Sequence, residues 1–274
     1  MRFALCSATR NTFIFTSAEE LKAAMSHPRL RGLSLPEIAR LFCRSGGSGA
    51  DGFVVVNKVE SSQEYSFKWD FYNRDGSSAE MCGNAARCMG FYVLNYLKYK
   101  EPEFTFQTLA GLVAVKTLSN GEFSVRMPEH QILRLGAEET VEGQIVKYSY
   151  VNTGVPHAVI ETDDLNLMRL RPLVKVFRFH STFGPAGANV SFFSRQGGGG
   201  YSGVTFERGV EDFTASCGTG VVAMALSIFS ERKNIPPRVD IQTPGGALKV
   251  DLDASEKFCW LIGAAGLDEE IHLY

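Results

Sequence analysis

Two stretches of this 274-residue chain share one pattern: CGNAARCMGFYVLNYL at residues 82–97 and CGTGVVAMALSIF at residues 217–229. Each follows a predicted strand and a polar loop, and each opens with Cys-Gly and a polar residue. Each then becomes apolar on nearly every side, which is typical of a helix buried in the centre of a domain. Cys82 and Cys217 are 135 residues apart in a chain whose half-length is 137. The pattern therefore indicates two copies of one structural unit.

This repeat predicts an α+β fold with two pseudo-symmetric lobes. Each lobe is expected to be a strand-rich sheet wrapped around its central apolar helix, with the active site in the cleft between the lobes. We expect residues 1–117 to form the N-terminal lobe with Cys82, and residues 118–262 to form the C-terminal lobe with Cys217. Residues 263–274 are expected to be a tail that packs back on the N-terminal lobe.

Capping and turn residues predict the remaining elements. Ser17 with Glu20, and Ser34 with Glu37, are capping boxes that predict two helix starts. The first helix is expected to run through Met25, after a turn at residues 10–12. Predicted strands lie at 53–56, 65–72, 104–108, 112–117, 122–127, 157–160, 189–194 and 203–207, with turns at Asn120-Gly121 and Gly197–Gly200.

Composition excludes several classes of protein. The 28 Lys and Arg nearly balance the 30 Asp and Glu, so no nucleic-acid partner is indicated. The longest apolar run, Val221 to Leu226, is far too short to span a membrane. Six cysteines without a C-x-x-C spacing predict free thiols in a reducing compartment, and hence a cytoplasmic protein, and they do not suggest a metal site.

The start of each buried helix suits acid/base catalysis. Its unpaired N–H groups and partial positive charge attract a carboxylate. The same field lowers the pKa of a cysteine to about 3.5–7.5, so a thiolate and a thiol can coexist near neutral pH. Cys82 and Cys217 on opposite faces of an α-carbon would invert it without a cofactor. The other four cysteines lie in apolar segments and are interpreted as core residues.

Motifs along nearly the whole chain resemble those of the diaminopimelate epimerases. They are Asn11, Ala50-Asp51-Gly52, Asn73-Arg74-Asp75-Gly76-Ser77, Met81 to Cys88, Gly154-Val155-Pro156-His157, Asn189, Glu207 to Val210, Ser216 to Gly220 and Pro244-Gly245-Gly246. The resemblance implies an isomerase that converts LL-diaminopimelate to meso-diaminopimelate in lysine biosynthesis. It also implies a cofactor-independent two-cysteine proton exchange, no metal, a small amino-acid substrate and a homodimer.

The resemblance further assigns roles to single residues. Cys82 and Cys217 become the acid/base pair. The cradle for the reacting carboxylate would be Gly83, Asn84, Gly218 and Thr219. The residues that hold the amino groups and the distant carboxylate would be Asn11, Asn73, Asn189, Glu207 and Arg208. His157 would sit near the thiols and orient them.

Three departures from the family pattern concern the substrate. Thr9-Arg10-Asn11-Thr12 replaces the usual Gly-Leu-Gly-Asn-Asp turn, Val155 stands where Asn is usual, and Phe213 stands where Glu is common. One alternative is therefore a racemase of a different amino acid on the same scaffold. Another is a non-catalytic redox or binding protein in which the two cysteines form a disulfide. Proline racemases rank lower, because they carry His where this chain has Asn84.

Overall fold

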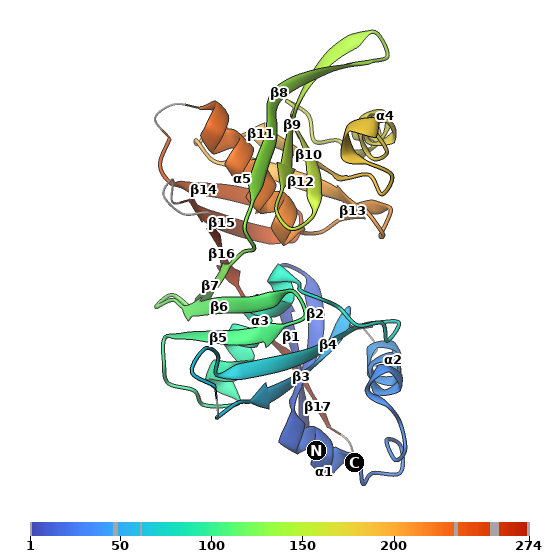
Figure 1. The fold of residues 1–274 in the computed structure, drawn as a ribbon, viewed down its shortest axis with the longest axis vertical. Helices are drawn as coiled ribbons and strands as arrows, with labels where there is room; N and C mark the ends of the chain where they lie inside the picture. Colours follow the sequence, from blue (N-terminus) through green and yellow to red (C-terminus); the bar gives the residue numbers. More distant parts are fainter. Residues whose placement is uncertain (1, 46–48, 61, 233–234, 253–257, 273–274) are drawn as a thin grey trace. The chain divides into compact units, whose positions relative to one another are not determined.

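The computed structural model describes residues 2–45, 49–60, 62–232, 235–252 and 258–272 (Figure 1). The chain divides into two units, residues 1–125 with 263–274 and residues 126–262. The sequence placed the boundary after residue 117. The structural division follows Val125 instead, because the strand at residues 122–126 pairs with the strand before it.

The first unit contains one sheet whose neighbouring strands come from both ends of the chain. Its order is β17 (Gly266–His272), β1 (Arg2–Ala8), β2 (Asn11–Ser17), β3 (Gly52–Lys58), β4 (Phe67–Asn73), β5 (Glu103–Thr108), β6 (Gly111–Thr117) and β7 (Glu122–Arg126). The β2–β3 and β4–β5 pairs are parallel, and the other pairs are antiparallel.

The second unit has the same series of pairings. Its order is β8 (Gln131–Val141), β9 (Gln144–Asn152), β10 (Pro156–Glu161), β11 (Asn189–Arg195), β12 (Tyr201–Glu207), β14 (Arg238–Thr243), β15 (Gly246–Leu252) and β16 (Cys259–Ala264), with the short β13 (Asp212–Thr214) also on β12. The third and fifth pairs are again parallel. The two units are thus repeats, and β17 takes in the first unit the place that β8 takes in the second.

A local motif shows the same repeat. The β5–β6 turn and the β14–β15 turn each begin with Gln-Thr and end with Gly. In both, the threonine hydroxyl donates to the glycine carbonyl at 2.8 Å, Thr108 to Gly111 and Thr243 to Gly246. The two threonines have the same separation as the two cysteines.

One apolar helix lies at the centre of each unit, α3 (Gly83–Asn95) in the first and α5 (Gly218–Glu231) in the second. Tyr92 of α3 stacks on Phe15 of β2, while Gly90 of the same helix lies against Phe123 of β7 and Val115 of β6. Strands near both ends of the sheet therefore touch α3, so the sheet curls around it. The predicted fold class is confirmed.

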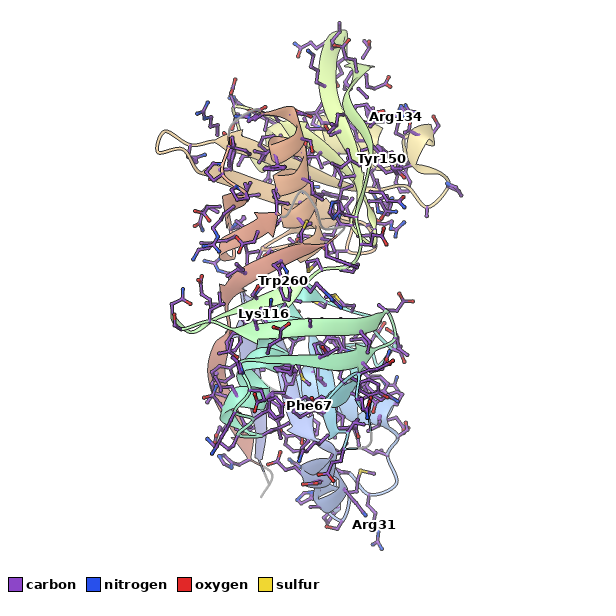
Figure 2. All side chains as sticks on the ribbon, turned by 60° about the vertical axis from the view of Figure 1, so that its left-hand side comes forward. Arg31, Phe67, Lys116, Arg134, Tyr150 and Trp260 are labelled. Carbon is purple, nitrogen blue, oxygen red and sulfur yellow. The ribbon has the colours of Figure 1, made fainter. Side chains whose placement is uncertain are left out.

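Further helices cover the other face of each sheet. These are α1 (Ala18–Ala24) and α2 (Leu35–Ser45) in the first unit, and α4 (Leu167–Phe177) in the second, with a short 3-10 turn at Ser181–Phe183. Strands buried on both faces have continuous apolar runs rather than alternation, as in residues 53–56. Figure 2 contrasts the buried ring of Phe67 with the exposed side chain of Arg31.

Most of the predicted elements are confirmed to within a few residues. The Ser17–Glu20 capping box is complete, and Glu37 accepts from both the backbone and the hydroxyl of Ser34. The turn predicted at residues 10–12 is displaced, because Thr9 and Arg10 form it with φ of 47° and 68° and Asn11 already belongs to β2. A two-residue hairpin turn of type I′ requires positive φ at both positions, and neither residue type signals that.

Several elements had no sequence signal. Most of β8 is exposed, so its residues do not alternate. Helix α4 contains Pro172, which usually argues against a helix, but its Asn166 cap accepts two backbone N–H groups. No helix in the described ranges is long and apolar enough to cross a bilayer.

The close approach of α5 to its sheet depends on Gly220. A methyl group at this position would overlap Thr205 Oγ1 and lie 3.1 Å from Ser191 Oγ. We expect Gly220→Ala to lower the free energy of unfolding by about 1–3 kcal/mol, measured by urea denaturation. Gly198→Ala is the control, since nothing lies within 4 Å of its added methyl, and it should change stability by less than about 0.5 kcal/mol. Equal stability of the two variants would contradict this packing.

Candidate active site

Cys82 occupies the start of the central helix in the first unit. It is the N-cap residue of α3, with extended backbone, and its side chain makes no capping hydrogen bond. Gly83 is the first helical residue and Asn84 the second, and Asn84 is only 3% exposed. The N–H groups of a first helical turn have no partner within the helix. The Cys82 thiol therefore lies beside donors that suit an anion.

A chain of amides and carboxylates connects this helix start to β2 and to the loop before β3. Asn84 donates to Asn11 Oδ1, and Asn11 donates to Asp51 Oδ2 at 3.1 Å. Asp51 also accepts the Thr12 N–H at 3.0 Å and Arg74 Nη2 at 3.0 Å. The structure thus brings together Asn11 and Asn84, both predicted site residues, and fixes the orientation of their amides.

Asn73 lies at the end of β4, on the exposed rim of the same unit. Its side-chain nitrogen donates to Ser77 Oγ at 3.0 Å. It lines a cavity of about 370 Å³ with Arg44, Asp51, Arg74 and Asp75. Asn73 and Asn11 therefore lie near the same carboxylate, that of Asp51.

Cys217 occupies the equivalent place in the second unit. It is the N-cap of α5 and is followed by Gly218, the first helical residue. The Cys217 thiol is 8% exposed, and its sulfur lies 3.3 Å from Thr219 Oγ1. The carboxylate of Glu207 also accepts a hydrogen bond from Cys217. The thiol proton thus has two acceptors.

His157 lies behind Thr219 and is completely buried. Asn189 Oδ1 accepts the Arg208 N–H at 2.7 Å, so the Asn189 amide nitrogen faces His157 Nε2 at 3.3 Å. Nε2 is therefore an acceptor, also toward Thr219 Oγ1 at 3.1 Å, and Nδ1–H donates to Ser191 Oγ at 3.0 Å. This arrangement specifies the neutral Nδ1–H tautomer.

Burial controls the charge of the groups around Cys217. Burial, together with the smaller effect of the Arg208 charge, lowers the pKa of His157 to about 3. Burial raises the pKa of Glu207, against the lowering effect of hydrogen bonds from Thr214 and Cys217. His157 is therefore neutral at physiological pH.

The alternation of side chains along the strands explains why these polar residues lie close together. Alternate residues point to one face of a strand, and Ser191 and Thr205 point toward the start of α5. Asn189 and Glu207 have the same parity, and His157 is paired with Asn189 across β10 and β11. Arg208 directly follows β12, and its Nη1 donates to the Gly187 carbonyl at 3.3 Å.

The sequence and fold of known proteins agree with this geometry. The family model for diaminopimelate epimerase matches residues 9–133 and 149–266. The diaminopimelate epimerase of Hydrogenobaculum sp. is 32% identical over 91% of this chain and 87% of its own length, and that of Archaeoglobus fulgidus is 34% identical over 84% and 83%. The chain belongs to the diaminopimelate epimerase family. It is an isomerase.

Solved structures show the same fold beyond the family. A PhzF-family phenazine biosynthesis protein from Enterococcus faecalis has a TM-score of 0.71 at 14% identity, covering 100% of this chain and 98% of its own. A hydroxyproline epimerase from Agrobacterium vitis has a TM-score of 0.67 at 17% identity, covering 99% and 91%. At these identities the likeness concerns the fold alone.

The three positions that depart from the family pattern have distinct surroundings. Val155 is half-buried in the turn before β10, where its carbonyl accepts the Thr153 N–H at 3.1 Å. Arg10 lies in the exposed β1–β2 turn. Phe213 packs edge-on against Phe206, so it replaces a polar family residue with an apolar contact to the sheet.

Residues outside the predicted set also contribute to the network. Asp51 and Arg74 were quoted only as parts of motifs, although Asp51 is the acceptor that holds Asn11. Arg87 holds Asn84, and Ser191 holds His157. A charged residue such as Arg87 inside an otherwise apolar helix was the signal for one of them, since such residues are rarely buried without a polar partner.

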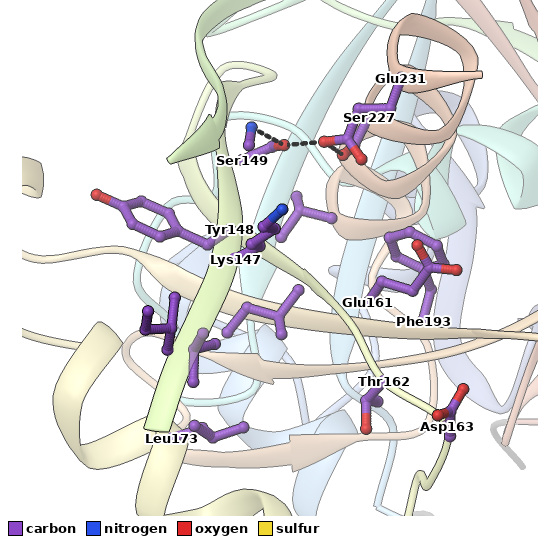
Figure 3. Close-up of a pocket in the computed structure, with 15 residues that line it drawn as sticks. Lys147, Tyr148, Ser149, Glu161, Thr162, Asp163, Leu173, Phe193, Ser227 and Glu231 are labelled. Carbon is purple, nitrogen blue, oxygen red and sulfur yellow. Dashed lines mark hydrogen bonds between the residues drawn. The ribbon is translucent and has the colours of Figure 1, made fainter. Parts of the chain in front are cut away.

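A larger cavity of about 450 Å³ in the second unit contains none of the predicted site residues (Figure 3). Two of its three carboxylates, Glu231 and Glu161, are already hydrogen-bonded. Glu231 accepts from Ser149 at 2.5 Å and from Ser227 at 3.3 Å, and Glu161 accepts from Arg232. We therefore interpret this cavity as a structural feature of the second unit and not as the active site.

The buried neutral His157 predicts a specific pH dependence of stability. Its folded pKa is below the unfolded value of about 6.5, so its stabilising effect is present above pH 6.5 and is lost as the pH falls toward 3. Between pH 7 and 4.5, the loss of unfolding free energy should be about 2–3 kcal/mol smaller in His157→Gln than in the parent. Urea denaturation at both pH values measures this. The same loss in both proteins would show that His157 is not held neutral.

Proposed function

We propose that this protein epimerises LL-diaminopimelate to meso-diaminopimelate by exchanging the α-proton between Cys82 and Cys217. The observation that carries the proposal is the duplicated placement of the two cysteines. Each is the N-cap of a buried central helix in one of two repeated units. The family match over both units, and the names of the relatives, support the substrate.

The proposed reaction needs one thiolate and one thiol. The thiolate takes the α-proton from one face of the substrate, and the electron pair of the C–H bond remains on the α-carbon. The thiol on the opposite face then donates its proton to that carbon. The two cysteines thereby exchange protonation states, and the configuration is inverted with no net change in atoms or electrons.

The helix starts provide the electrostatic part of the mechanism. Charge from the carbanion spreads into the substrate α-carboxylate, and the backbone N–H groups near Gly83, Asn84, Gly218 and Thr219 are suited to stabilise it. Because the proton transfers and the carboxylate cradle come from the chain itself, we propose that the reaction uses neither a metal nor an organic cofactor.

The polar residues around the cysteines are proposed to position the substrate. Asn11, Asn73 and Asn189 offer amides, and Glu207 offers a carboxylate for a substrate ammonium group. The Arg208 guanidinium has the fork geometry that binds a carboxylate through two parallel hydrogen bonds, and we assign it the distant carboxylate.

Two single-cysteine substitutions test this mechanism. Cys82→Ala and Cys217→Ala should each reduce epimerisation by about a thousandfold, because either change removes one of the two proton-transferring groups. Formation of the meso isomer, followed by chiral chromatography after dialysis against a chelator and hydroxylamine, measures this. Cys43→Ala, which removes a buried core thiol of α2, is the control and should keep normal turnover.

Turnover within a few fold of the parent in either site variant would contradict the two-thiol mechanism. Loss of parental activity on dialysis, with recovery on adding back a metal or pyridoxal phosphate, would contradict the cofactor-free mechanism.

Val155 is the observation that favours a second candidate, a racemase of a different amino acid. Valine keeps roughly the volume of asparagine but offers neither donor nor acceptor. An unpaired polar group of the substrate facing it costs about 1–3 kcal/mol, or roughly 5- to 150-fold in affinity. We therefore expect slow diaminopimelate epimerisation that Val155→Asn improves, measured as kcat/KM.

Two outcomes would contradict this expectation about Val155. Ordinary turnover of diaminopimelate with no gain from Val155→Asn would show that the position does not affect substrate choice. If neither form labels diaminopimelate in deuterated water while another amino acid is labelled, the racemase candidate replaces the first.

We further propose that the protein is a cytoplasmic homodimer. The six free thiols support a reducing compartment. Exposed apolar side chains on the β8–β9 hairpin, Ile132, Leu133, Leu135 and Ile145, support association with a second copy.

A further inference from the structure

Arg87 is a charged side chain buried at the centre of the first unit. It lies on α3 and is 0% exposed. Its Nη2 donates to Asn84 Oδ1 at 2.8 Å and to Thr9 Oγ1 at 2.9 Å. Within the described part of the chain, Nε and Nη1 have no hydrogen-bond partner. The mechanism above gives this residue no role.

The guanidinium is directed toward the start of α3. Helical side chains lean toward the N-terminus of their helix, and the bond to Asn84 places Nη2 beside the first turn, which Cys82 caps. The ionised form of Cys82 interacts electrostatically with Arg87. Burial lowers the pKa of Arg87 to about 10, so it remains a cation at neutral pH.

Thr9, whose hydroxyl accepts a hydrogen bond from Arg87, has a strained backbone conformation. Thr9 has φ of 47°, which is a rare conformation for a β-branched residue. The Thr9 hydroxyl accepts from Arg87 and donates to Asn84 Oδ1 at 3.2 Å. Strain of this kind persists where surrounding contacts enforce it, and it gathers at functional sites.

The neighbouring thiols Cys88 and Cys6 do not offset the charge of Arg87. Burial raises the pKa of Cys88 well above its usual value, and that of Cys6 on β1 to about 12, so both remain neutral thiols. Asp268 of β17 is bound by the Ser7 hydroxyl in an exposed contact. Lys116 of β6 pairs with a surface glutamate, and β2 contributes only Asn11 and Thr12 at this end.

The second unit lacks this cation. Val222 stands as far after Cys217 as Arg87 stands after Cys82, and it is buried and apolar. Cys217 contacts the Glu207 carboxylate and the Thr219 hydroxyl, with the neutral His157 behind Thr219, and the Arg208 cation acts on His157. These neighbours favour a protonated sulfur, whereas a buried cation favours an anionic one.

We propose that Arg87 is a positioning residue that stabilises the thiolate form of Cys82 and fixes the amide of Asn84, while Cys217 is held as the thiol. The proposal rests on the two-cysteine function given above. It makes the surroundings of the two cysteines unequal before substrate binds. The residues around each cysteine then determine that Cys82 is the thiolate and Cys217 is the thiol. The two sulfurs do not carry the thiolate equally often.

Site-resolved alkylation tests this proposal without requiring turnover. The protein is treated with iodoacetamide at a series of pH values, and mass spectrometry reports the rate at each cysteine. In the parent, Cys82 should become reactive at lower pH than Cys217, because iodoacetamide reacts with the thiolate. Arg87→Gln should slow Cys82 about tenfold or more at pH 6.5, and leave the rate of Cys217 unchanged.

Two further variants separate charge from structure. Arg87→Lys, which keeps the positive charge, should restore most of the Cys82 reactivity at pH 6.5. Lys22→Gln removes an exposed cation of α1 and should leave both rates unchanged. Circular dichroism verifies that each variant is folded. An unchanged pH profile for Cys82 in folded Arg87→Gln would overturn the proposal.

The parent protein decides the matter even if Arg87→Gln does not fold. Reaction of Cys82 only at the same pH as Cys217, or at higher pH, would overturn the proposal. Failure of the proposed function would be seen differently, as absence of α-proton exchange with diaminopimelate while the Arg87-dependent profile of Cys82 remains intact.

Discussion

The burial of two helices that are apolar on nearly every side is the constraint on which the rest of the structure depends. A helix of this kind gains stability only if a sheet encloses it, and the curled sheets around α3 and α5 do so. Its first turn still carries N–H groups without partners inside the helix. Those N–H groups need a polar environment. Cys82 and Cys217 lie next to them, as the N-cap residues of α3 and α5.

The sequence was sufficient for the parts of the fold that follow from local chemistry. The duplicated Cys-Gly pattern predicted the two central helices, and Ser17 with Glu20 predicted the start of α1. The Thr9-Arg10 turn was displaced by one residue because positive φ at Thr and Arg has no local signal. Helix α4 and strand β8 were not predicted, because tertiary packing overrides Pro172 in the former and exposure removes alternation in the latter.

Prediction of the candidate site from the sequence was limited in a similar way. Motifs led to the residues with chemistry of their own, among them Asn11, Asn84, His157 and Glu207. They did not show how those residues are connected. Asp51 orients Asn11, and Ser191 fixes the tautomer of His157, through contacts between strands distant in sequence. Such contacts depend on strand register, which spacing in one sequence does not specify.

A time course of isotope labelling tests the central claim, a reaction with two bases, most directly. The protein is incubated with LL-diaminopimelate in deuterated water, and deuterium at the α-carbon is followed in both isomers from the earliest times. Two cysteines on opposite faces predict that the newly formed meso isomer carries deuterium while the remaining LL isomer is still unlabelled. Equal labelling of both isomers from the start would indicate a single base and would contradict the account.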